Sequence, residues 1–257
     1  MSTTLLCWNV AGRAQRQPEQ AELIARLAPD LVCLQEVTPR SAPKWTAGLQ
    51  AAGWEHVAIA RPHADRADRP LSVLTAARAP LTRLPIDDVP WPERVLATRL
   101  DGLELVNVHS PISPKPGLAK VRTHEAVHAH LAAGRGPRVL CGDLNTPRRE
   151  HPDGRVWTFA RSRHGKLRPE RGERWDQAEL ALIKGLEQFG FRDAFRELHG
   201  YERRELSWQW QQWGGGYRLD HLVVSADIRV GRVEYLHEWR QQAGLSDHSP
   251  LLAELDW

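Results

Sequence analysis

Short apolar runs alternate with amphipathic segments along this 257-residue chain. The apolar runs predict strands at residues 3–10, 31–36, 70–76, 93–100, 103–109, 138–144, 218–224, 233–239 and 249–255. Apolar positions at helical spacing predict helices at 18–28, 41–52, about 117–133 and about 175–189. Asp101-Gly102, between two of the strands, is typical of a tight hairpin turn.

Hairpins and strand–helix–strand units are mixed in this order, so the pattern is neither purely parallel nor all-β. Two sheets packed face to face, with helices outside, would bury the apolar runs on both faces. No segment resembles a linker, and we expect residues 1–257 to form a single domain.

The composition is that of a globular protein, with 41% hydrophobic and 26% charged residues. A net charge of +3 permits a polyanionic partner without requiring one. Cys7, Cys33 and Cys141 lie inside apolar runs and are expected to be buried thiols in a reducing compartment. We find no signal peptide pattern and no apolar stretch of membrane-spanning length, so a cytoplasmic location is expected.

Polar side chains that suit metal binding or proton transfer follow several of the apolar runs. They belong to five short segments: Trp8-Asn9, Leu34-Gln35-Glu36, Asn107-Val108-His109-Ser110-Pro111, Gly142-Asp143-Leu144-Asn145 and Ser246-Asp247-His248. Polar residues at the ends of several strands are a common way to form an active site at one edge of a β-sheet. Each segment alone is a weak signal, and the ordered set carries the prediction.

Phosphoester hydrolysis requires a divalent cation, an activated water and stabilisation of charge on the phosphoryl oxygens. Magnesium prefers oxygen ligands and few protein carboxylates. Glu36, Asp143 and Asp247, at three separate strand ends, fit that preference. A zinc site would show clustered His and Cys instead. The segments therefore predict a metal-dependent phosphoester hydrolase that uses Mg²⁺ or Mn²⁺.

Taken in order, the five segments resemble the endonuclease/exonuclease/phosphatase superfamily, which includes exonuclease III-type AP endonucleases and deoxyribonuclease I. Three further segments are similar to family segments in the same order: Asp193-Ala194-Phe195-Arg196, Leu206-Ser207-Trp208 and Arg218-Leu219-Asp220-His221. The resemblance covers essentially the whole chain. It implies a deoxyribonuclease I-like α/β fold, a four-layer sandwich of two packed mixed β-sheets flanked by helices, with the site at one rim.

The resemblance also implies roles for the metal-side residues. Glu36 resembles the principal metal-binding glutamate, Asn9 the neighbouring asparagine, and Asp247 the second metal-side carboxylate. Asp143 is similar to the aspartate that orients or deprotonates the attacking water. Asn145 resembles the side chain that holds a phosphate oxygen.

Two histidines complete the implied catalytic set. His248 resembles the histidine at the phosphate, either a base or a charge stabiliser, and Asp220 the carboxylate that orients its ring. His109 resembles the acid of the deoxyribonuclease I and phosphatase branches, where AP endonucleases commonly carry tyrosine. Ala11 is a second departure from AP endonucleases, whereas Leu206-Ser207-Trp208 is closer to them. The branch therefore stays open.

Two features indicate a nucleic-acid substrate. In the tryptophan-rich segment we expect Trp208 to wall the site, Trp213 to contact substrate and Trp210 to lie in the core, with Arg218 also binding substrate. Segment 146–174, which carries nine basic residues against four acids, is expected to be a basic loop insertion that guides a phosphate backbone. A solvated loop is an equal alternative for that segment.

One motif matches a metal-binding signature but is not expected to bind a metal. His124-Glu125-Ala126-Val127-His128 matches the H-E-x-x-H signature of zinc proteases. No third-ligand pattern follows it, and the resemblance places this helix outside the sheets. The nearby His130 favours a surface histidine cluster instead.

The sequence thus predicts a divalent-metal-dependent phosphoester hydrolase, foremost a nuclease acting on DNA. It is expected to be a monomer with no membrane partner and no obligate protein partner. The alternative substrate is a small-molecule or lipid phosphoester, for which a phosphatase or phosphodiesterase activity would be expected. A catalytically silent nucleic-acid-binding module is disfavoured, because every catalytic position implied by the resemblance carries a suitable residue.

Overall fold

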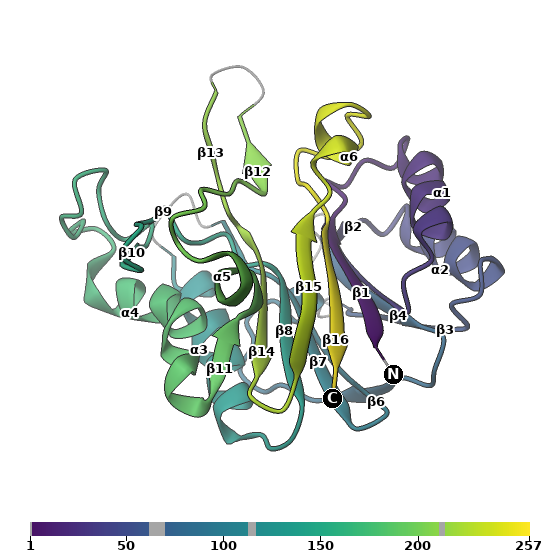
Figure 1. The fold of residues 1–257 in the computed structure, drawn as a ribbon, viewed down its shortest axis with the longest axis horizontal. Coiled ribbons are helices and arrows are strands. Elements are labelled where there is room, and N and C mark those ends of the chain that lie inside the picture. Colours follow the sequence, from purple (N-terminus) through teal and green to yellow (C-terminus); the bar gives the residue numbers. More distant parts are fainter. Residues whose placement is uncertain (1, 62–69, 113–116, 211–213) are drawn as a thin grey trace.

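Two six-stranded β-sheets lie face to face between two layers of helices in this computed structural model (Figure 1). The structure describes residues 2–61, 70–112, 117–210 and 214–257. The expected α/β four-layer sandwich is therefore confirmed, and so are its mixed sheets, since each contains parallel and antiparallel neighbours.

The first sheet has the strand order β15-β16-β1-β2-β4-β3. Only β1 and β2 are parallel neighbours in it. Its strands are β1 (Thr3–Asn9), β2 (Leu31–Val37), β3 (His56–Ile59), β4 (Ser72–Ala77), β15 (Arg229–Tyr235) and β16 (Leu251–Asp256).

The second sheet has the strand order β11-β14-β8-β7-β6-β5, in which β7 and β8 are the parallel pair. Its strands are β5 (Thr82–Leu84), β6 (Val95–Leu100), β7 (Leu103–His109), β8 (Arg138–Asp143), β11 (Phe191–Asp193) and β14 (Asp220–Ser225). The expected Asp101-Gly102 turn joins β6 to β7, and the register pairs Leu100 with Leu103.

Successive side chains of the central strands enter different cores. Leu5 and Cys7 of β1 belong to the core between the sheets, whereas Leu6 and Trp8 belong to the outer core beneath the helices. Because side chains alternate along a strand, a strand buried on both faces reads as a continuous apolar run. Cys7, Cys33 and Cys141 are free and buried between the sheets, as expected.

Helices cover both outer faces. α1 (Gln17–Leu27), α2 (Ala42–Ala51) and α6 (His237–Gln241) pack on the first sheet, and α3 (Ala119–Ala133) and α4 (Gly172–Ile183) on the second, while α5 (Ala194–His199) follows β11 (Figure 1). Two 3₁₀ turns, η1 (Pro92–Arg94) and η2 (Gly185–Phe189), precede β6 and β11. In the described residues no helix is long and apolar enough to cross a membrane.

Two short hairpins lie outside the main sheets. β9 (Arg149–Glu150) pairs with β10 (Val156–Trp157), and β12 (Trp208–Gln209) pairs with β13 (Gly216–Tyr217). The β12–β13 hairpin and α6 project beyond the sheets at the end where β1 finishes (Figure 1).

The predicted strand at 233–239 is only partly correct. β15 ends at Tyr235, and residues 237–241 form α6 instead. Trp239 of this helix packs edge-on against Trp8, with ring centroids 5.1 Å apart, in the core outside the first sheet. This packing gives residues 237–241 a buried face as a helix, which their local pattern did not reveal.

Candidate active site

The strand ends that carry the predicted residues meet at one edge of the two sheets. β1 is parallel to β2, and β7 to β8, so their carboxyl ends lie together within each sheet. β14 and β16 run antiparallel to β8 and β1, so they begin where those strands end. The residues brought to this edge are Asn9, Glu36, His109, Asp143, Asp220, Asp247 and His248.

Gly142 permits the close approach of β7 and β8 just below the site. A Cβ at this position would lie 1.9 Å from the Val108 carbonyl oxygen, and its φ of 133° disfavours any other residue. His109 and Asp143 are partners in the register of the two strands. The glycine of the Gly142-Asp143 pair therefore helps to place the catalytic candidates side by side.

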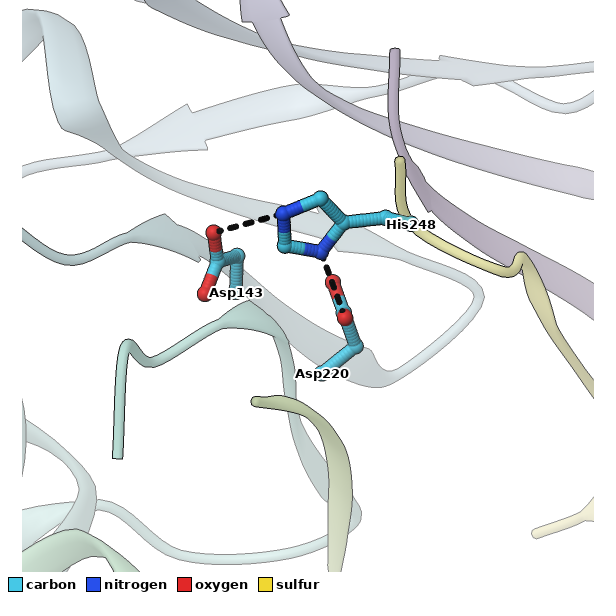
Figure 2. Close-up of side chains that lie close together, drawn as sticks. All are labelled: Asp143, Asp220 and His248. Carbon is cyan, nitrogen blue, oxygen red and sulfur yellow. Dashed lines mark hydrogen bonds and ion pairs between the residues drawn. The ribbon is translucent and has the colours of Figure 1, made fainter. Parts of the chain in front are cut away.

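His248 lies between two aspartates (Figure 2). Its Nδ1 is 2.8 Å from Asp220 Oδ2, and its Nε2 is 3.8 Å from Asp143 Oδ2. The contact at Nδ1 assigns the donor N–H to that nitrogen and turns Nε2 toward Asp143. All three side chains are buried, so water screens these charges weakly.

Backbone contacts hold this group in place. Tyr235 Oη donates to the Asp220 carbonyl oxygen at 2.6 Å, and the Asp220 amide donates to Ser207 Oγ at 3.0 Å. Ser246 Oγ accepts from the His248 amide at 3.0 Å and donates to the Asn9 carbonyl oxygen at 2.6 Å. Ser207 and Ser246, two serines of the short sequence segments, thus help to position the catalytic candidates.

The pKa values of both Asp143 and His248 are raised, by burial in the first case and by neighbouring charges in the second. Burial raises the pKa of Asp143 to about 7, with the positive charge of His248 acting against this rise. Burial alone would lower the pKa of His248, but the charges of Asp220 and Asp143 raise it to about 10. At neutral pH His248 is therefore a cation, and Asp143 is close to the pH at which it exchanges a proton.

Asn9 joins the two acids of the site. Its Nδ2 donates to Asp143 Oδ2 at 2.9 Å and to Glu36 Oε1 at 3.2 Å, while its Oδ1 accepts from the Ala11 amide. Glu36 lies beside an irregularity between β2 and β4 and has a φ of 60°. This bulge turns its carboxylate toward the site, where burial raises its pKa.

Asp247 is near enough to Glu36 for its charge to act on that carboxylate. Its negative charge also raises the pKa of Glu36, and its Oδ2 accepts from Trp208 Nε1 at 3.0 Å. A cation bound beside Glu36 and Asp247 would offset this unfavourable effect on the ionised Glu36 carboxylate. Glu36 and Asp247 therefore fit a divalent cation that prefers oxygen ligands. The predicted ligand Asn9 is less suited, because its carboxamide oxygen is already bonded to a backbone amide.

His109 Nε2 lies 3.5 Å from Glu36 Oε1 and 3.9 Å from Asp143 Oδ2. Burial, followed by the charges of Arg94 and His248, holds its pKa well below the usual range, so the ring is neutral at neutral pH. The acid role implied by the family resemblance needs a protonated ring. A neutral imidazole still offers one N–H donor to an oxygen of the substrate.

Arg94 is a site residue that the sequence analysis missed. Its Nη1 lies 2.9 and 3.2 Å from the two ring nitrogens of His109. The sequence did contain a signal for Arg94, in the β6–β7 hairpin. The Asp101-Gly102 turn pairs Leu100 with Leu103, and the same register pairs Val95 with Val108. One residue further along, Arg94 lies opposite His109. An arginine beside the site suits contact with a phosphoryl oxygen.

Asn145 lies two residues beyond Asp143 with a φ of 49°. Its amide donates to Asp143 Oδ1 at 2.9 Å, and its Nδ2 donates to the Ser110 carbonyl oxygen at 2.8 Å. Its own carbonyl oxygen accepts from Lys120 Nζ at 2.7 Å. Lys120 is buried on α3 and pairs with Glu179 of α4 at 2.8 Å.

The predicted substrate-binding residues have different outcomes. Trp208 lies at the site through its bond to Asp247, whereas Trp213 lies outside the described residues. Arg218 is buried with its guanidinium bonded to Glu150 and Asp193, so in this structure its charge is directed inward. Trp210, which we expected in the core, is 52% exposed. That expectation was wrong because Trp210 directly follows β12, in a hairpin outside the two six-stranded sheets.

The H-E-x-x-H residues do not converge on a metal site. His124 Nε2 contacts Ser110 Oγ at 2.7 Å inside the protein, whereas Glu125 is bonded to Arg174 at the surface. His128 packs against Phe189, and His130 pairs with Glu104. Of the described His, Cys, Asp and Glu residues, the group whose ligand atoms lie within 4.8 Å of one another is Asp143, Asp220 and His248.

Comparison with known proteins gives one family match and several similar folds. The model of the endonuclease/exonuclease/phosphatase family matches residues 6–248. An AP endonuclease from Archaeoglobus fulgidus has a TM-score of 0.74 and 19% identity, covering 99% of this chain and 100% of its own. A Neisseria 3′ phosphatase bound to a product DNA hairpin has a TM-score of 0.68 and 24% identity with the same coverage. A humanised D. rerio TDP2 has a TM-score of 0.69 and 15% identity, covering 100% of this chain and 99% of its own.

Proposed function

This chain belongs to the endonuclease/exonuclease/phosphatase family and is a phosphoric ester hydrolase, and on that premise we propose that it is a divalent-metal-dependent nuclease that cleaves phosphodiester bonds, foremost in DNA. The observation that carries the proposal is the buried Asp143–His248–Asp220 group, which lies beside the carboxylates of Glu36 and Asp247.

Glu36 and Asp247 would hold the cation, Mg²⁺ or Mn²⁺. When bound, such a cation supplies charge stabilisation to the phosphoryl oxygens. The contribution of the chain is to hold these two carboxylates close together, with Trp208 fixing Asp247 and Asn9 fixing Glu36.

Asp143 is the proposed base for the attacking water. Its pKa of about 7 places proton uptake near working pH, where a general base is most effective. Bonds from Asn9 to Oδ2 and from the Asn145 amide to Oδ1 orient the carboxylate. As the water attacks phosphorus, its proton would pass to an oxygen of Asp143. The P–O bond to the leaving nucleotide would break, and the leaving oxygen would take up a proton from solvent.

His248 is the proposed charge stabiliser. Because its pKa is raised to about 10, the ring carries a positive charge at neutral pH and does not accept a further proton. Asp220 fixes the ring through Nδ1, which leaves the Nε2 side free to face a phosphoryl oxygen. Of the two roles left open by the sequence, this pKa supports the electrostatic one.

Arg94 and neutral His109 are proposed to bind the opposite side of the phosphoryl group. Arg94 supplies a permanent charge, and His109 supplies one N–H donor. His109 Nε2 also lies 3.5 Å from Glu36 Oε1, so His109 would contact the substrate close to the cation that Glu36 would hold.

Nucleic acid is favoured over a small phosphoester for two reasons. Arginines and the exposed Trp210 line a pocket whose wall follows directly on Asn145, and one protein of similar fold was solved with a product DNA hairpin. Segment 146–174 contributes fewer free charges than expected, because Arg155, Arg161, Arg168 and Arg174 are paired with acids.

The test uses end-labelled DNA, as intact duplex, duplex with one abasic-site analogue, and single strand, with Mg²⁺ or with EDTA. We expect cleavage that EDTA abolishes and that Asp143→Asn lacks. Incision only at the lesion identifies a repair endonuclease, and ladders on every DNA identify a general nuclease. If no DNA is cleaved while a nucleotide monophosphate or phospholipid head group is hydrolysed, the small-phosphoester alternative replaces this proposal.

A further inference from the structure

A pocket of about 560 Å³ opens beside the candidate active site. Its walls come from the segment that follows Asn145, from the loop 201–206 and from the β12–β13 hairpin. The lining residues that matter here are Arg148, Arg149, Tyr201, Arg204, Trp210 and Tyr217. The volume lies within the range of sites that hold a drug-sized ligand.

The base of the pocket is a closed ion-pair network. Glu150 binds Arg218 and Arg196, each at 2.7 Å, and Arg218 also binds Asp193 at 2.6 Å. Their charges neutralise one another. This base is therefore a rigid structural floor and leaves the charge of the pocket to the residues at its rim.

Three arginines at the rim have no carboxylate partner among the described residues: Arg148, Arg149 and Arg204. Arg148 and Arg149 instead lie over the rings of Phe159 and Trp157. Four other arginines of segment 146–174 are paired with acids. Arg148 and Arg149 of this segment, together with Arg204, therefore place positive charge without an acid partner at the pocket, where it can contact phosphate groups.

Aromatic rings connect the pocket to the catalytic residues. Trp210 is 52% exposed, and its ring meets the edge of Trp208 with centroids 4.6 Å apart. Trp208 in turn stacks on Tyr217, with centroids 6.0 Å apart, and donates to Asp247. An exposed ring next to unpaired arginines is the arrangement that binds unstacked bases of single-stranded nucleic acid.

We propose that this pocket binds an unpaired nucleotide next to the phosphate being cleaved, with its base on Trp210 and its two flanking phosphates on Arg149 and Arg204. The inference rests on the proposed nuclease function and narrows its substrate to single-stranded or frayed strand ends. Arg148 is three residues beyond Asn145, so their Cα atoms lie within about 11 Å of each other. The pocket is therefore within reach of the neighbouring nucleotide on the same strand.

Binding is tested in the Asp143→Asn background by fluorescence anisotropy with a labelled single-stranded oligonucleotide. Arg149→Ala with Arg204→Ala is expected to raise Kd at least tenfold. It is also expected to reduce the slope of log K against log salt by about 1.4, for two lost phosphate contacts. The matched control is Arg155→Ala with Arg163→Ala, two exposed arginines of the same segment that do not line the pocket. Equal Kd values for the two double variants would overturn the proposal.

A second probe has the same length and phosphates but carries only abasic residues. Trp210→Ala is expected to weaken binding of the normal oligonucleotide about five- to tenfold and to leave the abasic probe unaffected. An equal effect on both probes, or no effect on either, contradicts base stacking at Trp210. A blunt duplex should bind more weakly than the single strand, and tighter duplex binding would contradict the narrowed substrate.

The two proposals fail in different ways. Wild-type protein that binds the oligonucleotide through the pocket but cleaves no nucleic acid with Mg²⁺ would refute the nuclease function and leave the pocket standing. Wild-type protein that cleaves DNA while the pocket variants bind normally would refute the pocket alone.

Discussion

At the residue scale, some residues of the site can be identified from the sequence, and other residues beside them cannot. Asp143, Asp220 and His248 were predicted from their short segments, and the structure brings them together. Arg94 lacks a recognisable motif, and only the register of the β6–β7 hairpin connects it to His109. The protonation of His109 also depends on burial and on the charges of Arg94 and His248, which lie outside β7 and are not part of its local sequence pattern.

Glu150 gives a pH prediction for stability at the same scale. Burial would raise its pKa, but the charges and bonds of Arg218 and Arg196 lower it to about 2. A carboxyl whose pKa is lowered by folding stabilises the protein above its unfolded pKa, and this stability is lost as pH falls toward the folded pKa. The loss between pH 4.5 and 2 amounts to about 3 kcal/mol at most.

The corresponding measurement is urea denaturation of wild type and Glu150→Gln between pH 7 and 2. The variant should be less stable at pH 7, because Arg196 and Arg218 lose their shared partner. The difference should shrink as the pH falls below 4.5. A difference that stays constant over this range would show that Glu150 does not titrate with folding.

At the scale of elements, α3 braces the loops that carry the catalytic side chains. Lys120 donates to the Asn145 carbonyl oxygen, and His124, four residues later on the same helix face, contacts Ser110. Ser110 in turn accepts from the Asn145 side chain. The H-E-x-x-H helix thus supports the site from outside the sheet and explains why its first histidine is buried.

Replacing Lys120 tests this support. Lys120→Met is expected to cost about 3–5 kcal/mol, because it leaves the buried carboxylate of Glu179 without its cation. Adding Glu179→Gln should restore part of this stability, since the amide oxygen still accepts from Thr146. The rate of cleavage should stay low in the double variant, because Asn145 has still lost its donor.

Denaturation and single-turnover rates of both variants provide the readout. Recovery of stability together with full recovery of rate would mean that Lys120 serves folding alone. An unchanged free energy of unfolding in Lys120→Met would contradict the buried ion pair itself.

Most long elements were predictable, and the short ones were not. The strands that form the sheet centres carry continuous apolar runs, so their positions agree with the structure within one or two residues. Residues 237–239 were assigned to a strand, because the packing of Trp239 on Trp8 that favours the helix is not visible in the sequence. The composition of segment 146–174 did not show whether it guides a phosphate backbone or is a solvated loop, since paired and unpaired arginines look alike in a sequence.

At the scale of the whole molecule, topology assembles the site. Two parallel strand pairs, each beside an antiparallel neighbour, direct seven polar residues from six strands or their flanking loops to one edge. The ordered segments predicted this convergence through the family resemblance. The pocket beside it was not predictable, because loop 201–206 and the β12–β13 hairpin meet the segment after Asn145 only in three dimensions.

The most direct test of the account compares wild type with Asp143→Asn in single-turnover cleavage of single-stranded DNA with saturating Mg²⁺, alongside the thermal midpoint of each protein. Because burial disfavours the ionised carboxylate, the amide should fold at least as stably as the acid. The cleavage rate should fall by about a thousandfold or more, as expected when a general base is lost. A variant that is equally stable and cleaves at the wild-type rate would contradict the assignment of Asp143 as the base at the centre of this site.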